Sequence, residues 1–543
     1  MKQPKTTLLK LDIPKNKRIL VTSDVHGNLK FLERVLEKAG FCDDDILIIV
    51  GDIVEKGTDS LKTLRYVKSL CEKGNTIALV GNVDAWRMYI IDKLCEDNAG
   101  ELFDYVVDYR EWKGTSFYEE LAAECGYELN SKSDVLMAKK DIISHFKSEF
   151  DFLASLPTAI ETKGYIFVHG GLVERDFDDN YDASFYSMTK NDAFLERTPH
   201  KFEKYVVVGH WPVSLYNDKI QQFSPIIDKE KKIISIDGGC GIKKEGQLNL
   251  LVLPSIDCDV DEIENIYFDD LPELVALGGQ EGSGEGIHIR WLDRKVTVIE
   301  QGEKYSVVEH NSTKKRLRVP TAYIYDGDNL KDYSDRLLNV EAGDELTLVY
   351  EASDGIIAKK NGEVGWYYGD YAKSGTIKTK RLTVGAIADE DRADTIRILR
   401  DNEVKKTYML PDLESDESAE RLFLRLKELS GNDDRYVFGV KLDGKLIGFI
   451  NDTEITDDYV EMGYCFHPQY HGNGYCTESF RAVIQYLFKK GVKEVRCGAF
   501  ETNEASIRVM QKCDMEPIDH NDEIEYRGKT HRCVYYSIKE NKK

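Results

Sequence analysis

Short apolar runs alternate with amphipathic stretches along the first half of the chain. The runs have the length and the β-branched content of strands, and the stretches between them carry apolar residues at helical spacing. The expected strands occupy residues 18–22, 45–50, 76–80, 165–168, 205–208, 233–236 and 248–253. The expected helices occupy residues 29–39 and 60–71 and lie within 98–152. This alternation is typical of a layered α/β domain.

The pattern changes after residue 254. Residues 255–280 are rich in acidic side chains, and glycines cluster up to Gly286, which predicts a flexible joint. Polar and apolar positions then alternate without a convincing helix, as in small antiparallel β units, until mixed α/β character returns near residue 376. The sequence therefore predicts a multidomain α/β protein with an N-terminal domain at 1–256, a joint at 257–286, a β-rich region at 287–374 and a C-terminal domain at 375–543.

The composition excludes several classes of function. The 543 residues suffice for several separate cores, and 41% hydrophobic with 31% charged residues is a globular composition. The net charge of −23, from 74 basic and 97 acidic residues, disfavours binding to nucleic acid or anionic lipid. No apolar run is long enough to span a bilayer and no secretory signal is evident, so we expect a cytoplasmic protein. The eleven cysteines are scattered, which argues against a disulfide framework or a zinc site.

Five short motifs follow apolar runs in the N-terminal domain, each where an expected strand ends. They are Asp24-Val25-His26-Gly27, Gly51-Asp52, Gly81-Asn82, His169-Gly170-Gly171 and Gly209-His210. Strand ends meet at one edge of an open α/β sheet, so the loops there can bring carboxylate, amide and imidazole groups together. Such oxygen and nitrogen ligands bind divalent cations. The sequence predicts a metal site at this edge.

Together the five motifs resemble the calcineurin-like metallophosphoesterases, and within them the phosphoprotein phosphatase branch, over residues 17–254. The resemblance implies an α/β sandwich that holds two divalent metal ions. It assigns the metal ligands as Asp24, His26, Asp52, Asn82, His169 and His210, with Asp52 bridging both ions and acting in catalysis. We expect manganese, with iron or zinc as alternatives, because the donor set does not choose among them. Such ions neutralise phosphoryl charge and activate water for phosphoester or pyrophosphate hydrolysis.

Two positions depart from the pattern of that branch. Val83 stands where the family carries a histidine that protonates the leaving oxygen, and valine cannot donate a proton. Lys56 stands where the family carries an arginine, and Arg87 lies nearby in the sequence, so we expect both to bind phosphate. Without the acid, substrates with good leaving groups are favoured. The glycine turn after residue 236 also resembles a segment near the C-terminal end of the phosphatase domain in that family. We assign this turn no chemistry.

A glycine loop in the C-terminal domain joins an expected strand to an expected helix. The motif Gln469-x-x-Gly472-x-Gly474 resembles the signature of the GNAT acetyltransferase superfamily, and residues 503–512 resemble its downstream helix. The opening at 380–384 resembles the branch that acetylates ribosomal-protein N-termini. Such a loop presents unpaired backbone N–H groups at a helix N-terminus, which suit a pyrophosphate. The resemblance, over 376–543, implies a GNAT α/β fold with acetyl-CoA as the co-substrate.

The same resemblance implies roles for individual residues. It assigns cofactor binding to Phe466, Gln469, Tyr470, His471, Gly472, Asn473, Gly474, Tyr475 and Asn503. Acetyl transfer also needs a base, for which Glu461 is the candidate, with pairing to a lysine as the alternative. Ser506 is a further catalytic candidate, with a role at the start of its helix as the alternative. The acceptor amine is either a peptide N-terminus or a small molecule, and no motif chooses between them.

The sequence thus predicts a bifunctional enzyme that combines protein serine/threonine phosphatase-like hydrolysis with acetyl transfer to an amine. One alternative is a dinucleoside polyphosphate or pyrophosphate hydrolase in the N-terminal half, which Val83 makes chemically easier. Another is a degenerate phosphatase-like sensor that regulates a single acetyltransferase. Residues 341–369 resemble a Src-homology-three-like barrel, so we expect the β-rich region to bind a peptide partner. No nucleic-acid or membrane partner is expected.

Overall fold

The computed structural model describes residues 1–173, 184–373, 375–410, 413, 415–432, 434–456 and 458–540. The chain divides into two compact units. Unit 1 comprises Met1–Leu271, Gly284–Arg336 and Asn361–Gly365, and unit 2 comprises Pro272–Ser283, Leu337–Lys360 and Trp366–Lys543. Among the described residues, no helix is long and apolar enough to cross a bilayer.

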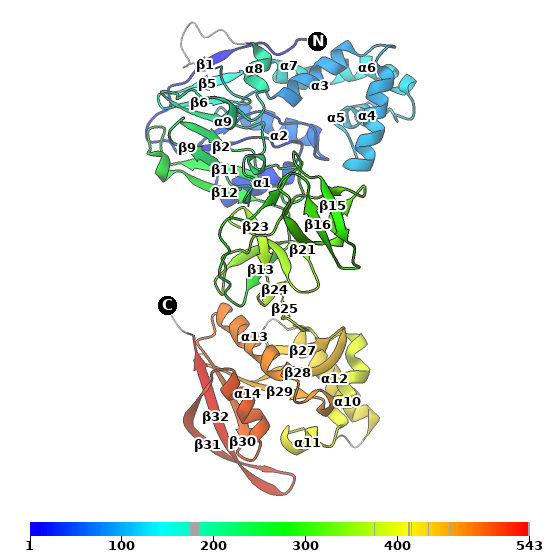
Figure 1. Cartoon of the computed structure of the whole chain (residues 1–543), viewed down its shortest axis with the longest axis vertical. Coiled ribbons are helices and arrows are strands. Elements are labelled where there is room, and N and C mark those ends of the chain that lie inside the picture. The colour runs from blue at the N-terminus through cyan, green and yellow to red at the C-terminus, as the bar shows by residue number, and fades with distance from the viewer. Residues whose placement is uncertain are drawn as a thin grey trace. The chain divides into compact units, whose positions relative to one another are not determined.

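Two β-sheets form the centre of unit 1 (Figure 1). The first has the order β12-β11-β2-β3-β4, in which β2, β3 and β4 are parallel and β11 is antiparallel to both of its neighbours. Its strands are β2 (Ile19–Thr22), β3 (Ile46–Ile49), β4 (Thr76–Ala78), β11 (Leu248–Leu253) and β12 (Glu264–Phe268). The second sheet has the order β1-β5-β6-β7-β10-β9. Its strands are β1 (Leu8–Lys10), β5 (Ala159–Glu161), β6 (Tyr165–Val168), β7 (Tyr205–Val208), β9 (Ile226–Asp228) and β10 (Ile233–Ser235).

The two sheets pack together through side chains that alternate along each strand. In β2, Ile19 and Val21 belong to an apolar cluster that also contains Phe167 of β6 and Ile234 of β10, whereas Leu20 belongs to the cluster on the helical side. Because successive side chains point to opposite faces, a continuous apolar run buries both faces of a strand. The apolar runs of the sequence therefore produce a sandwich with helices outside it.

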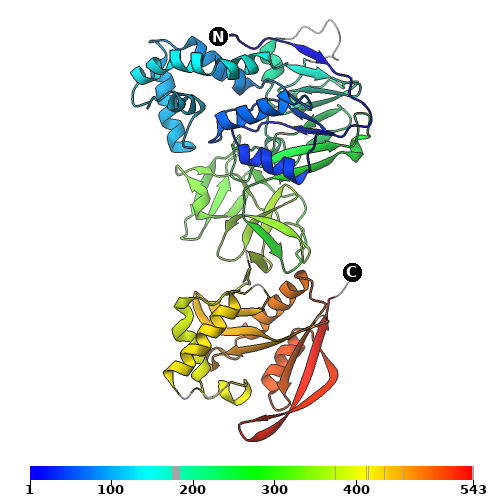
Figure 2. The same ribbon diagram turned by 180° about the vertical axis from the view of Figure 1, so that it is seen from behind.

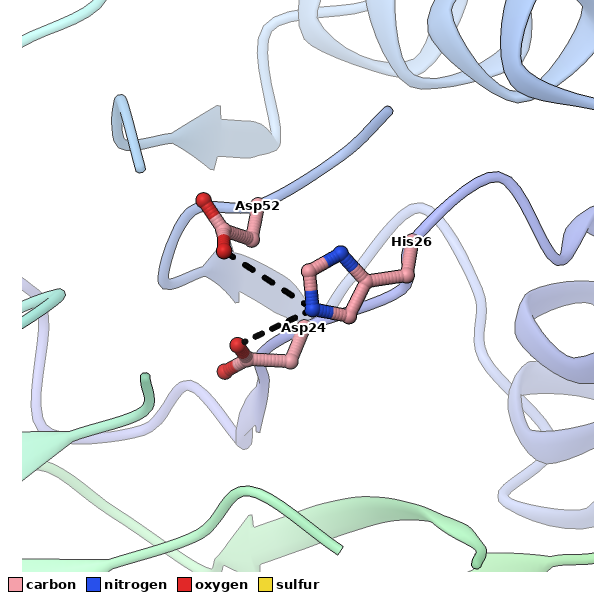
Figure 3. A group of neighbouring side chains, drawn as sticks. All are labelled: Asp24, His26 and Asp52. Carbon is pink, nitrogen blue, oxygen red and sulfur yellow. Dashed lines mark ion pairs between the residues drawn. The ribbon is translucent and has the colours of Figure 1, made fainter. Parts of the chain in front are cut away.

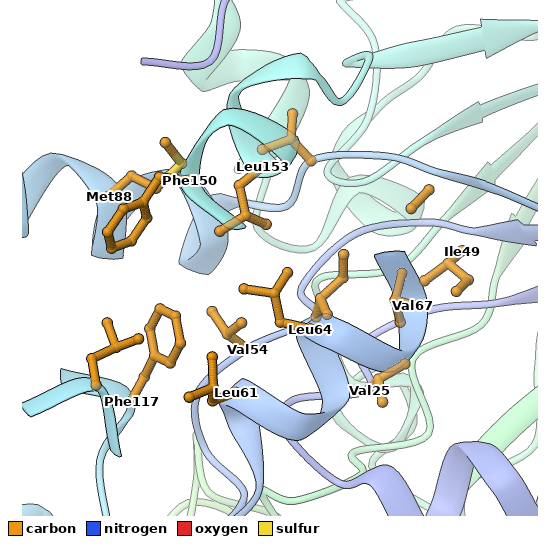
Figure 4. Packing of buried hydrophobic residues seen from close by; sticks show 14 of the residues in the cluster. Val25, Ile49, Val54, Leu61, Leu64, Val67, Met88, Phe117, Phe150 and Leu153 are labelled. Atoms are coloured by element: carbon orange, nitrogen blue, oxygen red, sulfur yellow. The ribbon is translucent and has the colours of Figure 1, made fainter. Parts of the chain in front are cut away.

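Helices extend outward from the first sheet: the first two pack directly on its strands, and the others pack mainly on these helices and on one another. They are α1 (Leu29–Lys38), α2 (Ser60–Glu72), α3 (Asn82–Lys93), α4 (Ala99–Trp112), α5 (Phe117–Glu124), α6 (Lys132–His145) and α7 (Lys147–Ser155), and two short helices, α8 (Phe185–Thr189) and α9 (Phe194–Arg197), follow later in the chain. Figure 4 shows part of the shared core, in which Leu61, Leu64 and Val67 of α2 lie near Val25 and Ile49. This packing fixes the helices relative to the strand ends.

Unit 1 also contains the strands between residues 288 and 334. They are β14 (His288–Ile289), β15 (Val296–Glu300), β16 (Tyr305–His310), β17 (Arg316–Pro320), β18 (Ile324–Tyr325), β19 (Asn329–Leu330) and β20 (Tyr333–Ser334). The backbone N–H of His288 donates to the carbonyl of Asp218 at 2.8 Å, and Lys243 forms an ion pair with Asp332. Such contacts attach these strands to loops of the sandwich. Within unit 1, the start of β23 (Glu363–Tyr367) pairs with β8 (Gln221–Gln222).

A mixed sheet runs through unit 2 (Figure 2). Its strands are β13 (Glu273–Ala276), β21 (Glu345–Glu351), β22 (Ile356–Lys360), β24 (Tyr371–Lys373), β25 (Thr376–Lys378), β26 (Leu382–Gly385), β27 (Val437–Leu442), β28 (Lys445–Ile455), β29 (Val460–Phe466), β30 (Glu494–Phe500), β31 (Glu516–Tyr526) and β32 (Lys529–Lys539). Its helices are α10 (Arg392–Arg400), α11 (Val404–Thr407), α12 (Asp416–Ser430), α13 (Tyr475–Lys489) and α14 (Glu504–Lys512). The expected α/β class with a β-rich middle is confirmed.

Candidate functional site

The predicted metal ligands of unit 1 follow the ends of β2, β3, β4, β6 and β7, on loops or, for Asn82, at the first residue of α3. The backbone N–H of Asp24 donates to the carbonyl of Gly51 at 3.1 Å, and the N–H of His26 donates to the carbonyl of Asp52 at 2.9 Å. Backbone hydrogen bonds therefore connect the loop after β2 to the loop after β3. A Cβ on Gly81 would lie 2.0 Å from Asp52 Oδ1. Glycine at this position therefore allows the loop after β4 to approach the Asp52 carboxylate closely.

Asp24, His26 and Asp52 form a compact buried group (Figure 3). His26 Nε2 lies 3.5 Å from Asp24 Oδ1 and 3.7 Å from Asp52 Oδ2, and His169 Nε2 lies 3.4 Å from the same Asp52 oxygen. Asn82 Oδ1 is 3.1 Å from His169 Nε2. The structure thus brings five of the six predicted ligands within hydrogen-bond or ion-pair distance of one another.

The sixth predicted ligand, His210, contacts both the His169 ring and the Asp192 carboxylate. Its ring centroid is 5.5 Å from that of His169, while its Nε2 lies 2.8 Å from Asp192 Oδ1 and its backbone N–H donates to Asp24 Oδ2 at 3.0 Å. Burial and the neighbouring charge of His169 lower the pKa of His210 to about 4. A neutral imidazole is the form that binds metal.

The carboxyl groups at the centre have strongly displaced pKa values. Burial raises the pKa of Asp24. Burial would also raise the pKa of Asp52, but the charge and hydrogen bond of His169 outweigh it and hold that pKa well below its usual range. For His169, the carboxylates of Asp52 and Asp24 outweigh the effect of burial and raise its pKa to about 10. Buried carboxyl and imidazole groups with displaced pKa values are typical of functional sites.

The donors present fit divalent metal ions. The donor set is carboxylate, imidazole and amide, which suits manganese, iron or zinc. Asp24 Oδ1 is buried and has no hydrogen-bond partner. A buried carboxylate oxygen without a hydrogen bond is costly unless a cation meets it.

The two predicted phosphate-binding residues lie in different surroundings. Lys56 Nζ is 3.0 Å from His26 Nε2 and so lies at the centre of the site. Arg87 Nε instead lies 3.0 Å from Glu55 Oε2, and its guanidinium stacks 4.2 Å above the ring of Tyr105. Tyr105 in turn donates to Glu55 Oε1 at 2.7 Å. Glu55, the residue before Lys56, thus holds Arg87 in place by contacting both Arg87 and Tyr105.

Val83 and Asp84 are the second and third residues of helix α3, directly after Asn82. Val83 is buried, and its backbone N–H donates to Asp52 Oδ1 at 2.8 Å. Asp84 Oδ1 accepts from the backbone N–H groups of Ile53 and Val54, and Oδ2 accepts from that of Gly81. One carboxylate therefore connects the loop after β3 to the loop after β4. Burial and the charge of Asp52 raise the pKa of Asp84 to about 7. Asp84 therefore positions the loops that carry the ligands.

Asp237, in the glycine turn after residue 236, is a further carboxylate of the site that the five motifs do not predict. Asp237 follows β10, its Oδ1 accepts from Gly239 at 2.7 Å, and its buried Oδ2 has no hydrogen-bond partner. Burial and the nearby charge of Asp24 raise the pKa of Asp237 well above its usual range. Its position directly after a strand, shared with Asp24 and Asp52, is the signal that could have found it.

Unit 2 contains a cavity of about 580 Å³ at the point where two strands separate. Parallel pairing between β29 and β30 involves only Val460 with Val495 and Glu461 with Arg496. Beyond these pairs, residues 462–466 and 497–500 line opposite parts of the cavity wall. The separation of the two strands thus opens a slot in the sheet.

The predicted cofactor residues divide between this cavity and its rim. Those that line the cavity are Phe466, Tyr470, His471, Gly472, Gly474, Tyr475 and Asn503. Gln469 is exposed and Asn473 bonds to the carbonyls of Tyr470 and His471, and neither lines the cavity. The carbonyl of Phe466 is 2.9 Å from His471 Nε2, so this backbone group already has a partner.

Both catalytic candidates of unit 2 line the cavity. Burial raises the pKa of Glu461, and its Oε1 accepts from Thr453 at 2.9 Å. Asn503 caps helix α14 and donates through Nδ2 to Ser506 Oγ at 3.1 Å. This contact leaves the Ser506 hydroxyl hydrogen directed away from the amide. No lysine pairs with Glu461 among the contacts of the described residues.

Comparison with known proteins gives matches for both halves of the chain. A curated protein of Shewanella sp. (strain W3-18-1), named "Bis(5'-nucleosyl)-tetraphosphatase, symmetrical", is 26% identical over 257 residues, which cover 40% of this chain and 88% of that protein. The "Uncharacterized N-acetyltransferase YoaA" of Bacillus subtilis (strain 168) is 28% identical over 141 residues, which cover 25% of this chain and 80% of that protein.

A solved GNAT-family acetyltransferase from Bacillus anthracis is 24% identical and covers 30% of this chain and 98% of its own, with a TM-score of 0.27. Residues 17–232 match the family model described as calcineurin-like phosphoesterase, and residues 381–516 match that of the acetyltransferase (GNAT) domain. The chain thus carries a calcineurin-like phosphoesterase domain and, C-terminal to it, a GNAT acetyltransferase domain.

Proposed function

We propose that unit 1 hydrolyses a phosphoanhydride bond of a dinucleoside polyphosphate and that unit 2 transfers acetyl from acetyl-CoA to an amine. The motifs alone favour a phosphoprotein substrate for unit 1. Two observations support the nucleotide instead: the buried Val83 at the position of the acid, and the name of the curated relative.

The chemistry of the leaving group carries this choice. A serine alkoxide is a poor leaving group and needs a proton from the enzyme, whereas a nucleoside polyphosphate departs as a stable anion. Val83 has no proton to give, and its backbone N–H is already bonded to Asp52. A site with this substitution therefore favours anhydride over ester cleavage.

The residues of unit 1 would bind the phosphate chain as follows. Divalent metals held by Asp24, His26, Asp52, Asn82, His169 and His210 would neutralise phosphate charge and activate water. Lys56 Nζ lies beside His26 and would bind a phosphate oxygen as a point charge. Arg87, held by Glu55 and Tyr105, would contact a phosphate farther along the chain. Asp237 joins the site as a further carboxylate at a strand end.

In unit 2, Glu461 and Ser506 would handle the protons of acetyl transfer. As the amine nitrogen attacks the thioester carbonyl, a C–N bond forms and the C–S bond breaks. Glu461 takes the proton that the amine loses. Ser506 Oγ donates a proton to the departing thiolate and regains one, through solvent, from the protonated Glu461, so both residues return to their starting forms. Both side chains line the same cavity, which supports this assignment.

The test of the hydrolase uses the full chain with added manganese and three substrates: diadenosine tetraphosphate, a phosphoserine peptide and p-nitrophenyl phosphate. We expect the dinucleotide to be the best substrate by kcat/KM, and Asp52→Asn to abolish its hydrolysis. Asp104→Asn, a change at an exposed position of α4, is the matched control and should be active. Preferential cleavage of the phosphoserine peptide would overturn the nucleotide assignment, and no hydrolysis of any substrate would overturn the hydrolase.

A further inference from the structure

Helix α3 starts at the predicted metal ligand Asn82 and carries two large aromatic side chains on the same face. Trp86 and Tyr89 lie four and seven residues after Asn82, which places all three on one side of the helix. With a rise of 1.5 Å per residue, the Cα atoms of Trp86 and Tyr89 follow that of Asn82 at about 6 Å and about 10 Å along the axis. Side chains lean toward the helix N-terminus, so Trp86 leans toward the metal site.

The opposite face of α3 is buried, which fixes the orientation of the aromatic face. Met88 and Ile91 are 0% and 2% exposed and belong to the main core cluster of unit 1. Figure 4 shows Met88 next to Phe150 within this cluster. Trp86 and Tyr89, by contrast, are 55% and 46% exposed. The helix cannot rotate to bury them without pulling its apolar residues out of the core.

Trp86 and Tyr89 already form a flat surface. Their rings are stacked at a centroid distance of 5.6 Å with an angle of 18° between their planes. Two exposed aromatic rings side by side on one helix face present a flat apolar surface on which a planar ring can pack. The pair begins one helical turn from Asn82, whose Oδ1 is 3.1 Å from His169 Nε2.

We propose that Trp86 and Tyr89 form the stacking platform for a nucleobase of the substrate of unit 1. The inference rests on the proposed hydrolysis of dinucleoside polyphosphates. When the phosphate chain lies at the metal site, the ribose and base of one nucleoside reach outward by about the length of a helical turn or two. The aromatic face of α3 begins within this distance of Asn82. Stacking on a ring does not depend on the identity of the base, so the platform would accept different nucleobases.

The test compares a substrate that has bases with one that has none. Diadenosine tetraphosphate and inorganic tripolyphosphate are given to the wild-type chain, to Trp86→Ala and to Tyr89→Ala. We expect each variant to raise KM for the dinucleotide about tenfold with kcat changed less than twofold, as for the loss of one stacking contact. The kinetics with tripolyphosphate, which has no base to stack, should change less than twofold. Trp86→Phe, which retains a flat ring, should restore most of the affinity.

Tyr368→Ala is the matched control, since Tyr368 is also a half-exposed ring stacked on a tryptophan, at 5.5 Å from Trp366. It should leave KM for the dinucleotide unchanged. An unchanged KM in both Trp86→Ala and Tyr89→Ala would overturn the platform while leaving the hydrolase assignment intact. An equal loss with both substrates would also overturn it, because the variants would then disturb the metal site itself. If the wild type cleaves tripolyphosphate but no dinucleotide, the proposed function fails first.

Discussion

Several predicted metal ligands have a left-handed backbone. The φ angles of Asp24, His26, Asp52 and His210 are 56°, 51°, 53° and 64°, a region that costs free energy for residues other than glycine. The surrounding hydrogen bonds, such as those from Asp24 and His26 to the next loop, maintain these conformations. Such residues are expected where side-chain direction matters more than local stability.

Val83→His tests the effect of the missing acid on substrate choice. A histidine here can protonate a leaving oxygen, and general acid catalysis contributes about 10²-fold or more. We expect the ratio of kcat/KM for the phosphoserine peptide to that for diadenosine tetraphosphate to rise at least tenfold. Val83→Leu controls for the change in volume and should leave the ratio unchanged. A ratio that stays constant in Val83→His would show that the acid does not decide substrate choice.

The pH profile of acetyl transfer tests Glu461 as the base. A base must be ionised to accept a proton, and burial raises the pKa of Glu461, so the acidic limb of kcat/KM should lie above the usual carboxyl pKa of about 4.3. Glu461→Gln should remove this contribution and lower the rate about 100-fold at neutral pH. Release of CoA measured between pH 5 and 9 gives both values.

Glu454→Gln is the matched variant for this measurement. Glu454 lies opposite Glu461 on β28, and its charge helps to raise the pKa of Glu461. Its removal should keep the plateau rate and move the acidic limb to lower pH. If Glu461→Gln keeps both the rate and the limb of the wild type, another group is the base.

At the scale of elements, strand ends determine both sites. The sequence predicts the strands and the polar residues after them, because alternation and glycine turns are local signals. It predicts neither the contact of Arg87 with Glu55 and Tyr105 nor the bond of His471 to the carbonyl of Phe466. These contacts depend on how α4 and the loop before α13 pack, which no local pattern encodes. The position of Asp237 after β10 could have been predicted by the rule used for Asp24.

The loop before α13 offers a prediction at this scale. Gly474 is the N-cap of α13 with a φ of 79°, so Gly474→Ala should cost about 1 kcal/mol of stability and distort the loop that we expect to bind the pyrophosphate. We expect KM for acetyl-CoA to rise about fivefold or more. Gly491, after the other end of α13, has a φ of 90° and open space around it. Gly491→Ala should cost the same stability, seen in urea unfolding, without changing KM. Equal KM values in both variants would argue against binding by this loop.

At the scale of the whole molecule, the two activities should differ in their need for metal. Among the described residues, Asp24, His26 and Asp52 of unit 1 form a cluster with the spacing of metal ligands. Dialysis against a chelator should therefore abolish dinucleotide hydrolysis, and added manganese should restore it. Acetyl transfer measured on the same samples should change less than twofold. Loss of both activities, with recovery of both on adding manganese, would show that unit 2 also depends on a metal.

The order in which the chain contributes to its two units has a consequence for dissecting the protein. The chain passes back and forth between the two units. Unit 1 contains Gly284–Arg336 and Asn361–Gly365, which follow the first segment of unit 2 (Pro272–Ser283) in the sequence. The second segment of unit 2, Leu337–Lys360, lies between these two segments of unit 1. No single cut therefore yields two intact halves. A nick after Ser283 by a protease should leave fragments that migrate together on a native gel and separate in denaturant, and a gene cut at that point should yield two chains that must be expressed together.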